Sequence, residues 1–504
     1  MKYIFYLLIF SISFFITQAQ NVGIGTTTPH ASAILDVTST NKGVLIPRVS
    51  SLPLNPATGL LVYYLNKFYY YNGTEWLPVG EKSEAAIQYL SPKDNYPTTV
   101  DANDSLGVSI ASGNNYFIVG APGAEHGAAV KAGAVYTAFF LENTNRLVWN
   151  KAGISAAVAP LAGDGFGTSV AASGYDFAVG APYRDMGGVD RGAVYAVNTT
   201  NNPPTFSILP APTVLENNDL LGKSVALATS SAGAIVVGGA SNDDGGYGAV
   251  HTWFKPSAGA YAYETRLIDG ASISIENFGH AVDVTMDNDE NAWLFVGAPF
   301  ANAAGAATSK RGKVYIYKRN VTTNIWTLHQ SLLGTEDGGR FGYSLSHAKS
   351  GTRQVLAIGQ PGETFIPGGS PGGSSFSQVH IYSFDTTANL WVSSATINPS
   401  NYNNGGESVS VVYDGSVPYL LTGHSKGLAG GSITTPFGVA NYYYRNGAVW
   451  TLKQKYIDID GNTGYDFGRA VFINSARQIL IGSSSAPIDG DVQHGKITAI
   501  DGDF

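Results

Sequence analysis

The sequence contains no cysteine among its 504 residues. This absence excludes disulfide bonds, thiolate zinc sites, cysteine nucleophiles and a lipid-modified N-terminal cysteine. Charged residues are also scarce, at 13% of the chain against about 25% in ordinary soluble proteins. The formal net charge is −8, and no run of Lys and Arg is present to collect phosphate groups. We therefore expect no nucleic-acid partner.

Long apolar runs are confined to the N-terminus. Residues 4–16 (IFYLLIFSISFFI) follow Lys2 and precede the small-residue ending Thr17-Gln18-Ala19, which is typical of a secretory signal peptide. This run is too short for a membrane span, which needs about 20 residues. We expect residues 1–19 to be removed on export and the mature chain to have no transmembrane segment. The protein would then be secreted or on the cell surface, on the bacterial exterior.

Glycine and aromatic residues are abundant, with 61 glycines and 12% aromatics, a composition that favours short strands and tight turns. Residues 20–81 are expected to form a small β-rich N-terminal module. Leu60–Tyr71 and Trp76–Val79 are rich in β-branched and aromatic residues, and Asn72-Gly73 suits a two-residue hairpin turn. The segment resembles the N-terminal module of bacterial secreted, tail-fibre-like surface proteins. Its Pro and small polar residues offer no chemistry, so we expect a role in spacing, display or self-association.

The rest of the chain repeats one pattern seven times. A glycine that opens a short strand of small residues recurs at intervals of 60, 55, 57, 63, 64 and 62 residues, at Gly107, Gly167, Gly222, Gly279, Gly342, Gly406 and Gly468. A second apolar strand then ends in a tight turn, as in FIVGAP, FAVGAP, IVVGGA, LFVGAP and LAIGQP, and in the altered LLTGHS and ILIGSS. A third strand and a fourth complete each unit. Such a period is typical of a repeat fold.

These turns and their spacing resemble FG-GAP repeats, which form the seven-bladed propeller at the N-terminus of integrin alpha subunits. The resemblance implies an all-β fold, a seven-bladed β-propeller of four-stranded antiparallel blades over residues 82–504. The residues independently favour a closed ring, because a four-stranded blade cannot bury both faces alone and must pack against neighbours. First strands carry small residues, as expected near a crowded axis, whereas Tyr, Phe and Trp gather in the third and fourth strands.

The last copy stops after its third strand, near Ile500. The segment of residues 85–91 precedes the first copy, at the place where other units have a fourth strand. We predict that it completes the last blade, which removes an exposed edge strand and closes the ring.

Two acidic loops are candidate calcium sites, because Ca²⁺ prefers oxygen ligands at alternate positions. The first contains Asp458, Asp460, Asn462 and Asp466, and the second, weaker one contains Asp287, Asp289 and Asn291. Integrin-type blades carry a similar loop between the first strand and the GAP turn, where the second candidate lies but not the first. The alternative is that both are acidic turns without an ion. No other cofactor is indicated.

Acidic or amide residues also stand before the repeated glycines, and we interpret them as turn residues that accept bonds from nearby backbone N–H groups. They are Asp104, Asp164, Asp219, Glu276, Asp337, Asn404 and Asp466. Gly423-His-Ser425-Lys-Gly427 matches a GxSxG nucleophile pattern by its letters. The segment after it is a poor helix former, so we do not expect a serine hydrolase. No catalytic residue is assigned.

The residues after the GAP turns are the best candidates for contacting a partner. They are His126, Tyr183, Arg184, Asp185, Asp243, Asp244 and Phe300, and they are expected to gather on the same face as the FG loops. The resemblance implies cell adhesion, so the leading hypothesis is an exported, non-enzymatic binding protein for an extracellular protein or glycan. A carbohydrate-binding lectin is one alternative. A polysaccharide hydrolase or lyase is another, and it would need two carboxylates about 5 to 9 Å apart.

Overall fold

The computed structural model describes the chain between residues 22 and 500 with gaps. The described residues are 22–53, 55–64, 67–71, 73, 76–79, 88–90, 104–114, 116–125, 129–141, 146–149, 161–198, 205–270, 275–286, 291–303, 309–320, 322–362, 377–398, 406–425, 438–457, 466–485 and 495–500. The expected signal peptide, residues 1–19, lies outside them. Within the described residues, no helix is long and apolar enough to cross a membrane.

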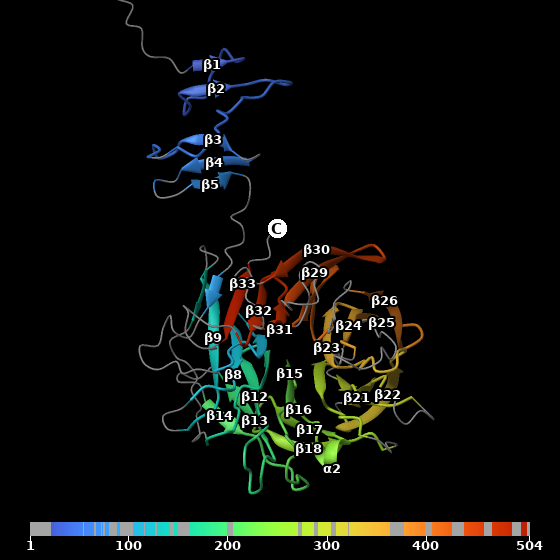
Figure 1. Cartoon of the computed structure of the whole chain (residues 1–504). Helices are drawn as coiled ribbons and strands as arrows, with labels where there is room; N and C mark the ends of the chain where they lie inside the picture. The colour runs from blue at the N-terminus through green and yellow to red at the C-terminus, as the bar shows by residue number, and fades with distance from the viewer. Residues whose placement is uncertain are drawn as a thin grey trace, which may run out of the picture. The chain divides into compact units, whose positions relative to one another are not determined.

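The chain forms two compact units, Met1–Glu84 and Ala85–Phe504. In the first, β1 (Val22–Ile24) pairs in parallel with β2 (Leu35–Val37), and a separate antiparallel sheet holds β3 (Leu61–Tyr64), β4 (Lys67–Tyr71) and β5 (Trp76–Val79) (Figure 1). The apolar stretch from Leu60 to Tyr71 therefore folds back on itself, since Tyr64 pairs with Lys67. The hairpin expected at Asn72-Gly73 is formed by β4 and β5. Its loop is longer than the expected two residues, because Tyr71 pairs with Trp76.

The second unit is a seven-bladed β-propeller, which confirms the predicted fold class. The first three blades are β7 (Ser109–Ser112), β8 (Phe117–Ala121), β9 (Ala134–Leu141) and β10 (Arg146–Trp149); β11 (Ser169–Ser173), β12 (Asp176–Ala181), β13 (Ala193–Asn198) and β14 (Thr205–Ile208); and β15 (Ser224–Ser230), β16 (Gly233–Ala240), β17 (Ala249–Pro256) and β18 (Ala262–Leu267). The short α2 (Asp243–Gly246) follows β16.

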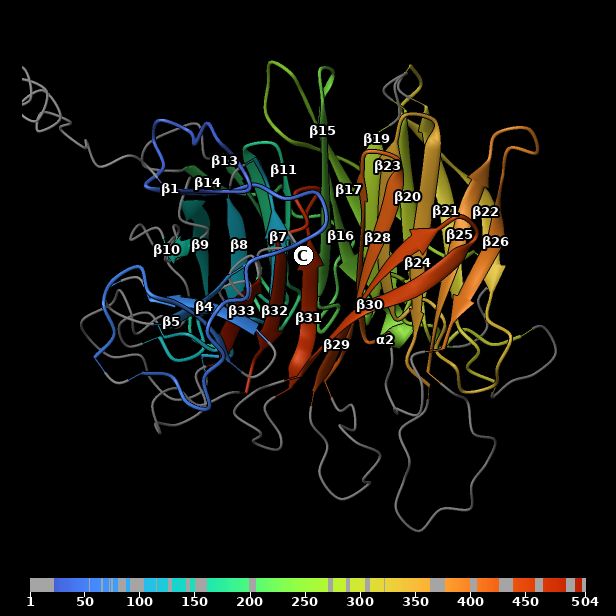
Figure 2. The same cartoon turned by 90° about the horizontal axis from the view of Figure 1, so that it is seen from above.

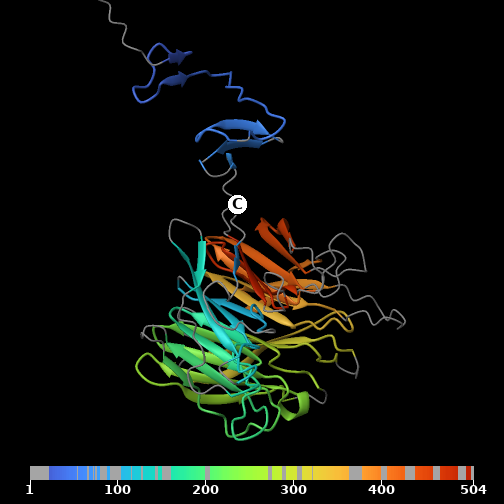
Figure 3. The ribbon, with the colours of Figure 1, turned by 60° about the vertical axis from the view of Figure 1, so that its left-hand side comes forward.

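The fourth to sixth blades are β19 (Ala281–Met286), β20 (Ala292–Ala298), β21 (Lys313–Asn320) and β22 (Ile325–Leu333); β23 (Ser344–Ser350), β24 (Arg353–Gln360), β25 (Gln378–Asp385) and β26 (Leu390–Ile397); and β27 (Ser408–Asp414), β28 (Val417–His424), β29 (Val439–Asn446) and β30 (Val449–Ile457). The last blade is β31 (Phe467–Ile473), β32 (Ile479–Ser483), β33 (Lys496–Ile500) and β6 (Gln88–Leu90). The blades follow one another around the ring in chain order, from cyan through green and yellow to red (Figure 3).

The last blade joins the two ends of the propeller. Its outer strand is β6, which runs antiparallel to β33 with Leu90 opposite Ile497. On the inner side, Leu106 of the first blade bridges Gly495 of the last blade. The red strands of the last blade accordingly lie beside the blue-cyan strands of the first in two views (Figures 1 and 2). The ring is therefore closed, and β6 occupies the place that the sequence predicts for the missing strand.

The contact between neighbouring blades is built on glycine. A Cβ added to Gly120 in the GAP turn of the first blade would lie 2.0 Å from the carbonyl oxygen of Gly167, the FG glycine of the next blade. An added Cβ would come just as close, at 1.9–2.1 Å from the next FG carbonyl oxygen, at the other six GAP glycines around the ring: Gly180, Gly239, Gly297, Gly359, Gly423 and Gly482. The two altered turns of the sequence, LLTGHS and ILIGSS, thus keep the one residue that this packing requires.

Apolar side chains fill the space between blades rather than a single centre. Phe278, for example, is fully buried in a cluster that joins the third blade, through Val237 and Val250, to the fourth, through Leu294. Its ring lies edge-on to Tyr315, with centroids 5.2 Å apart. Each blade thus hides the apolar faces of its neighbours, as a repeat fold requires.

Candidate functional site

The GAP turns and the FG loops lie at the same end of the propeller, which we call the GAP face. In the second blade the N–H of Tyr183, after the GAP turn, donates to the carbonyl of Asp164 in the FG loop. Gly123 bonds Asp104 and Phe300 bonds Glu276 in the same way in the first and fourth blades. Figure 2 shows the strands from the side, with α2 at this end. In these three blades the residues after the GAP turn therefore lie beside the FG loop.

The acidic residues before the FG glycines are mostly internal. Asp104, Asp164, Asp219 and Glu276 are each less than 5% exposed. Asp164 accepts a hydrogen bond from the N–H of Leu161 and Asp219 accepts one from the N–H of Glu216, so the interpretation as turn residues is confirmed for these two. Asp337 is exposed and pairs with Arg311, and Asn404 lies outside the described residues.

The candidate contact residues divide into buried and accessible side chains. Arg184 is only 9% exposed and forms an ion pair with Asp164, and Asp243 is 3% exposed. Both side chains therefore serve interactions inside the blade. Tyr183 is 40% exposed, and Asp185, Asp244 and Phe300 also retain exposed surface. His126 lies outside the described residues.

Asp243 belongs to a compact polar cluster in the third blade. Its carboxylate pairs with Arg266 and lies 3.7 Å from Nε2 of His251, while Arg266 also reaches Asp244 at 3.0 Å. Burial opposes the charge on Asp243, but the nearby His251 and the hydrogen bonds from Arg266 hold its pKa below the usual value. Burial lowers the pKa of His251. The cluster therefore contains a fixed ion pair rather than a proton donor poised for catalysis.

The two candidate calcium loops are only partly described. Asp458, Asp460 and Asn462 lie outside the described residues, and so do Asp287 and Asp289. Asp466 has a left-handed backbone, with φ of 54°, and accepts a hydrogen bond from Ser485 at 2.8 Å. Asn291 directly precedes β20. Among the described residues, no three His, Cys, Asp or Glu side chains gather as metal ligands.

Among the described residues, Ser425 has no histidine hydrogen-bond partner. Its hydroxyl donates to the carboxylate of Glu407 at 2.5 Å. The neighbouring His424 is fully buried and instead contacts Thr422, Asn441 and the N–H of Gly406. A catalytic serine needs the imidazole within hydrogen-bond reach, so the GxSxG letters serve structure here.

Two carboxylates meet at one hydroxyl in the fourth blade. The hydroxyl oxygen of Tyr315 lies 2.6 Å from Asp269 and 3.0 Å from Glu276, and Lys313 is 3.7 Å from Glu276. Burial and these two carboxylates raise the pKa of Tyr315, so the hydroxyl stays protonated. No sequence motif marks this group, because Asp269 follows β18 whereas Tyr315 lies in β21, 46 residues later.

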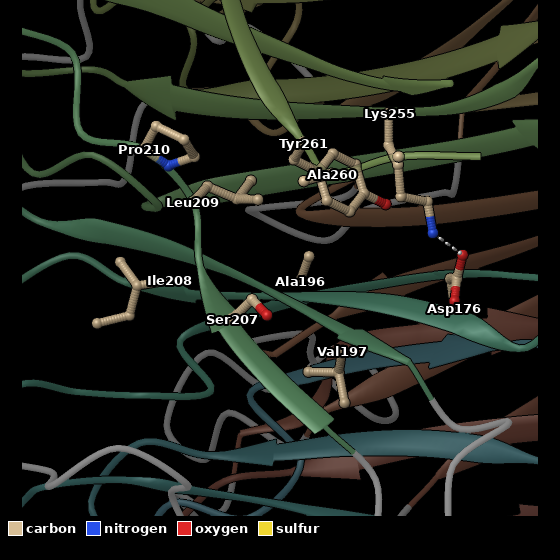
Figure 4. Close-up of a pocket in the computed structure, with 11 residues that line it drawn as sticks. Asp176, Ala196, Val197, Ser207, Ile208, Leu209, Pro210, Lys255, Ala260 and Tyr261 are labelled. Atoms are coloured by element: carbon tan, nitrogen blue, oxygen red, sulfur yellow. Dashed lines mark hydrogen bonds and ion pairs between the residues drawn. The ribbon is translucent and has the colours of Figure 1, made fainter. Parts of the chain in front are cut away.

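A cavity of about 440 Å³ opens at the rim, between the second and third blades (Figure 4). Its walls include Val197, Ile208, Leu209, Pro210 and Tyr261, and its charged groups are Asp176 and Lys255, which form an ion pair at 3.1 Å. Because these two charges neutralise each other, the cavity fits an uncharged group. No sequence motif could reveal it, since Asp176 and Lys255 are 79 residues apart.

Comparison with known families assigns both parts of the chain. The model of the FG-GAP repeat matches residues 155–197, which include most of the second blade. The model described as a phage tail like trimerisation region matches residues 23–92. Both matches agree with the resemblances noted in the sequence, and the FG-GAP match falls within the seven-bladed propeller.

Comparison with individual proteins gives weaker likenesses. No curated protein matches the sequence. A solved protein from Lactobacillus plantarum is 14% identical over 73% of this chain and 88% of its own, with a TM-score of 0.45. A provisional 6-phosphogluconolactonase from Bacteroides uniformis is 10% identical over 78% of this chain and 92% of its own, with a TM-score of 0.42.

Proposed function

We propose that this is an exported, non-enzymatic binding protein that acts in adhesion. Residues 22–79 hold three chains together, and each propeller binds an extracellular protein or glycan through its GAP face. The observation that carries this proposal is the combination of an apolar, poorly buried N-terminal unit with a closed propeller whose described FG loops and GAP turns lie at one end.

The N-terminal unit exposes the side chains that a self-associating module needs. Val62 is its one buried apolar side chain among the described residues. Large apolar side chains are instead exposed, by 38% to 85%, at Val22, Ile24, Ile34, Leu35, Val37, Val44, Leu45, Leu60, Phe68 and Tyr70. Contiguous exposed apolar surface marks an interaction site, and the family matched by residues 23–92 is named for trimerisation.

The chain enters the propeller away from the GAP face. Gly495, at the start of β33, bridges Leu106 beside the FG loop, so β33 begins at the GAP face. Because β6 is antiparallel to β33, it begins at the opposite end, with Gln88 across from Ala499. The start of β6 and the GAP turns therefore lie at opposite ends of the propeller. Three linked propellers then bind by avidity, which strengthens attachment without a new contact.

The polysaccharide hydrolase or lyase stays as the second candidate because of Asp269 and Glu276. Both carboxylates lie within hydrogen-bond distance of the Tyr315 hydroxyl, at 2.6 and 3.0 Å, so they come close to each other at one place. Glu276, however, is only 3% exposed. A screen for depolymerised polysaccharide, with Asp269→Asn as the matched control, tests this candidate directly.

Two measurements test the leading proposal. Light scattering of the exported chain should give the mass of a trimer, and Leu45→Glu should release monomers, whereas Val449→Glu on the propeller should leave the trimer intact. Leu45 and Val449 are 76% and 65% exposed. Arrays of glycans and extracellular proteins should give retained ligands without turnover. A monomeric wild-type chain, or a product released from any bound ligand, would contradict the proposal.

A further inference from the structure

One position of the repeat places a side chain beside the propeller axis in every blade. It is the residue that follows the FG glycine and opens the innermost strand at the GAP face. The seven residues are Val108, Thr168, Lys223, His280, Tyr343, Glu407 and Arg469. All retain solvent exposure, although the glycines before them are buried. The first two are small and uncharged, and the other five are large and polar or ionisable.

Two cations at this end have no carboxylate partner among the described residues. Nζ of Lys223 lies 5.9 Å from the ring centroid of Tyr183, and Cζ of Arg340 lies 5.4 Å from that of Phe300. Arg340 directly precedes Phe341 of the fifth FG pair. Its Nε is buried without a hydrogen-bond acceptor in the described part of the chain. A buried donor in this state has a free-energy cost that an acceptor from a ligand would remove.

A third cation comes from the last blade. Arg469 is exposed and forms an ion pair with Glu407, which also accepts from Ser425. The ring of His280 in the fourth blade lies 4.5 Å from that of Tyr343 in the fifth. Burial first, and then the charges of Lys223, Arg469 and Arg340, lower the pKa of His280 to about 4. Lys223 and Arg469 occupy the repeated position of the third and seventh blades, and Arg340 lies in the FG loop of the fifth, so the three cations come from the same end of the propeller.

The charge of this cluster opposes that of the whole chain. Three cations against the carboxylates of Glu407 and Asp466, which both act on Arg469, leave a local excess of one positive charge, in a protein of net charge −8. Such a focus attracts an anionic group, and guanidinium and ammonium donors pair strongly with carboxylates. Each unpaired cation also has an aromatic ring beside it. A ligand that presents a carboxylate together with an apolar ring face satisfies both features, and a uronic acid residue of a polysaccharide is such a group.

We propose that the axial end of the GAP face binds the carboxylate of an acidic glycan through Lys223, Arg340 and Arg469. This inference deepens the proposed function and rests on it. The aromatic rings of Tyr183 and Phe300, which lie beside the two unpaired cations, contact the sugar ring. The rim cavity, with its neutralised ion pair, is a separate site and does not contribute.

The test measures binding of a galacturonate hexamer to the full exported chain by calorimetry. The probe's fully methyl-esterified form has the same rings without the charge, and a hexa-aspartate peptide has the charge without the rings. We expect the hexamer to bind and both comparison ligands to bind at least about tenfold more weakly, the loss expected for one charged hydrogen bond. Binding should also weaken as salt is raised, because salt screens exposed charges.

Variants then locate the site. Lys223→Gln should weaken binding of the hexamer by about tenfold, and Lys223→Arg should restore it. Lys349→Gln removes the same charge at the far end of β23 and should change nothing. On hexamer binding, the histidine signal that His280→Gln removes should titrate at higher pH. Equal binding of the methyl ester or the peptide, or an unchanged Lys223→Gln variant, overturns the inference and leaves the proposed function standing. Absence of any retained ligand on the arrays overturns both.

Discussion

The carbonyl oxygen of Gly107 in the first blade lies against Gly482 in the last, where an added Cβ would come within 2.0 Å of it. The two residues are 375 positions apart in the sequence, so this contact forms only when the ring closes. It is one of seven equivalent contacts between neighbouring blades, and it involves backbone atoms that cannot move aside without separating the sheets.

We therefore expect Gly482→Ala to lower the free energy of unfolding by about 3 kcal/mol, the upper end of the usual cost of overpacking. Gly270→Ala is the matched control, because an added Cβ there meets nothing within 4 Å. It should stay within about 0.5 kcal/mol of the wild type. Chemical denaturation followed by tryptophan fluorescence measures both. Equal stability of the two variants would show that the joint tolerates a methyl group.

The seam strand should be essential to the whole ring. Deleting residues 82–92 removes β6 and leaves β33 with an unpaired edge, so we expect a lower melting temperature and aggregation. Removing residues 20–81, which lie in the other compact unit, should leave the melting temperature of the propeller unchanged. Calorimetry of the two deletions makes the comparison. A wild-type transition in the first deletion would refute the role of the seam.

A serine in the first strand links most blades to the next. Oγ of Ser109, Ser169, Ser224, Ser344 and Ser408 donates to the carbonyl of the following FG glycine at 2.8–2.9 Å. The fourth blade has Ala281 at this position. Its GAP glycine, Gly297, nevertheless meets the carbonyl of Gly342 as closely as in the other blades. Ala281→Ser should therefore add a bond and raise the free energy of unfolding by about 1 kcal/mol.

Ser169→Ala is the reciprocal change and should lower that free energy by about 1 kcal/mol. The double variant should return close to the wild-type value, because the sites lie in different interfaces. Destabilisation by Ala281→Ser would mean that the fourth interface does not share the geometry of the others.

Asp283 should make stability depend on pH. Its carboxylate accepts the N–H of His347 in the next blade at 2.6 Å, and burial raises its pKa from 3.8 to about 7. Between these values the folded protein keeps a proton that the unfolded chain has released. The free energy of unfolding should therefore fall as the pH rises from about 4 to about 7.

Asp283→Asn has no proton to release and keeps an oxygen that can accept the bond. It should be more stable than the wild type above pH 7 and have a flatter pH profile below it. Urea unfolding at several pH values measures this difference. The same slope in both proteins would contradict the role of Asp283.

The calcium prediction for residues 458–466 is testable without a ligand. If the loop binds the ion, Ca²⁺ should raise the melting temperature relative to chelator, because an ion that binds only the folded state stabilises it. Asp460→Ala should abolish the shift, and Asp287→Ala separates the contribution of the second loop. An unchanged melting temperature with Ca²⁺ would contradict a calcium site in either loop.

The fold was largely predictable because its determinants are local and repeated. Each FG glycine and each GAP glycine occupies the same place in every blade, so their spacing alone defines the blades and their number. The extra strand in the N-terminal unit was not foreseen, because Leu60–Tyr71 is uniformly apolar and aromatic and gives no sign of where it turns.

The candidate site was much less predictable. Lys223 looks like an ordinary strand residue in the sequence, and Arg469 is 246 residues away from it. Their relation appears only when the blades are arranged around the axis, because the same position of each repeat then meets at one place. Burial was equally hidden, since Arg184 and Tyr183 are neighbours in the chain but only Tyr183 is accessible.

The direction of β6 has a mechanical consequence for an anchored protein. If the N-terminal unit is held and a ligand pulls on the GAP loops, tension reaches the propeller along the length of β6. The bonds that pair Gln88, Tyr89 and Leu90 with β33 then bear the force together instead of opening one after another. Strands loaded in shear resist separation better than strands that are peeled apart one bond at a time. The strand that closes the propeller therefore also suits the protein to withstand pulling.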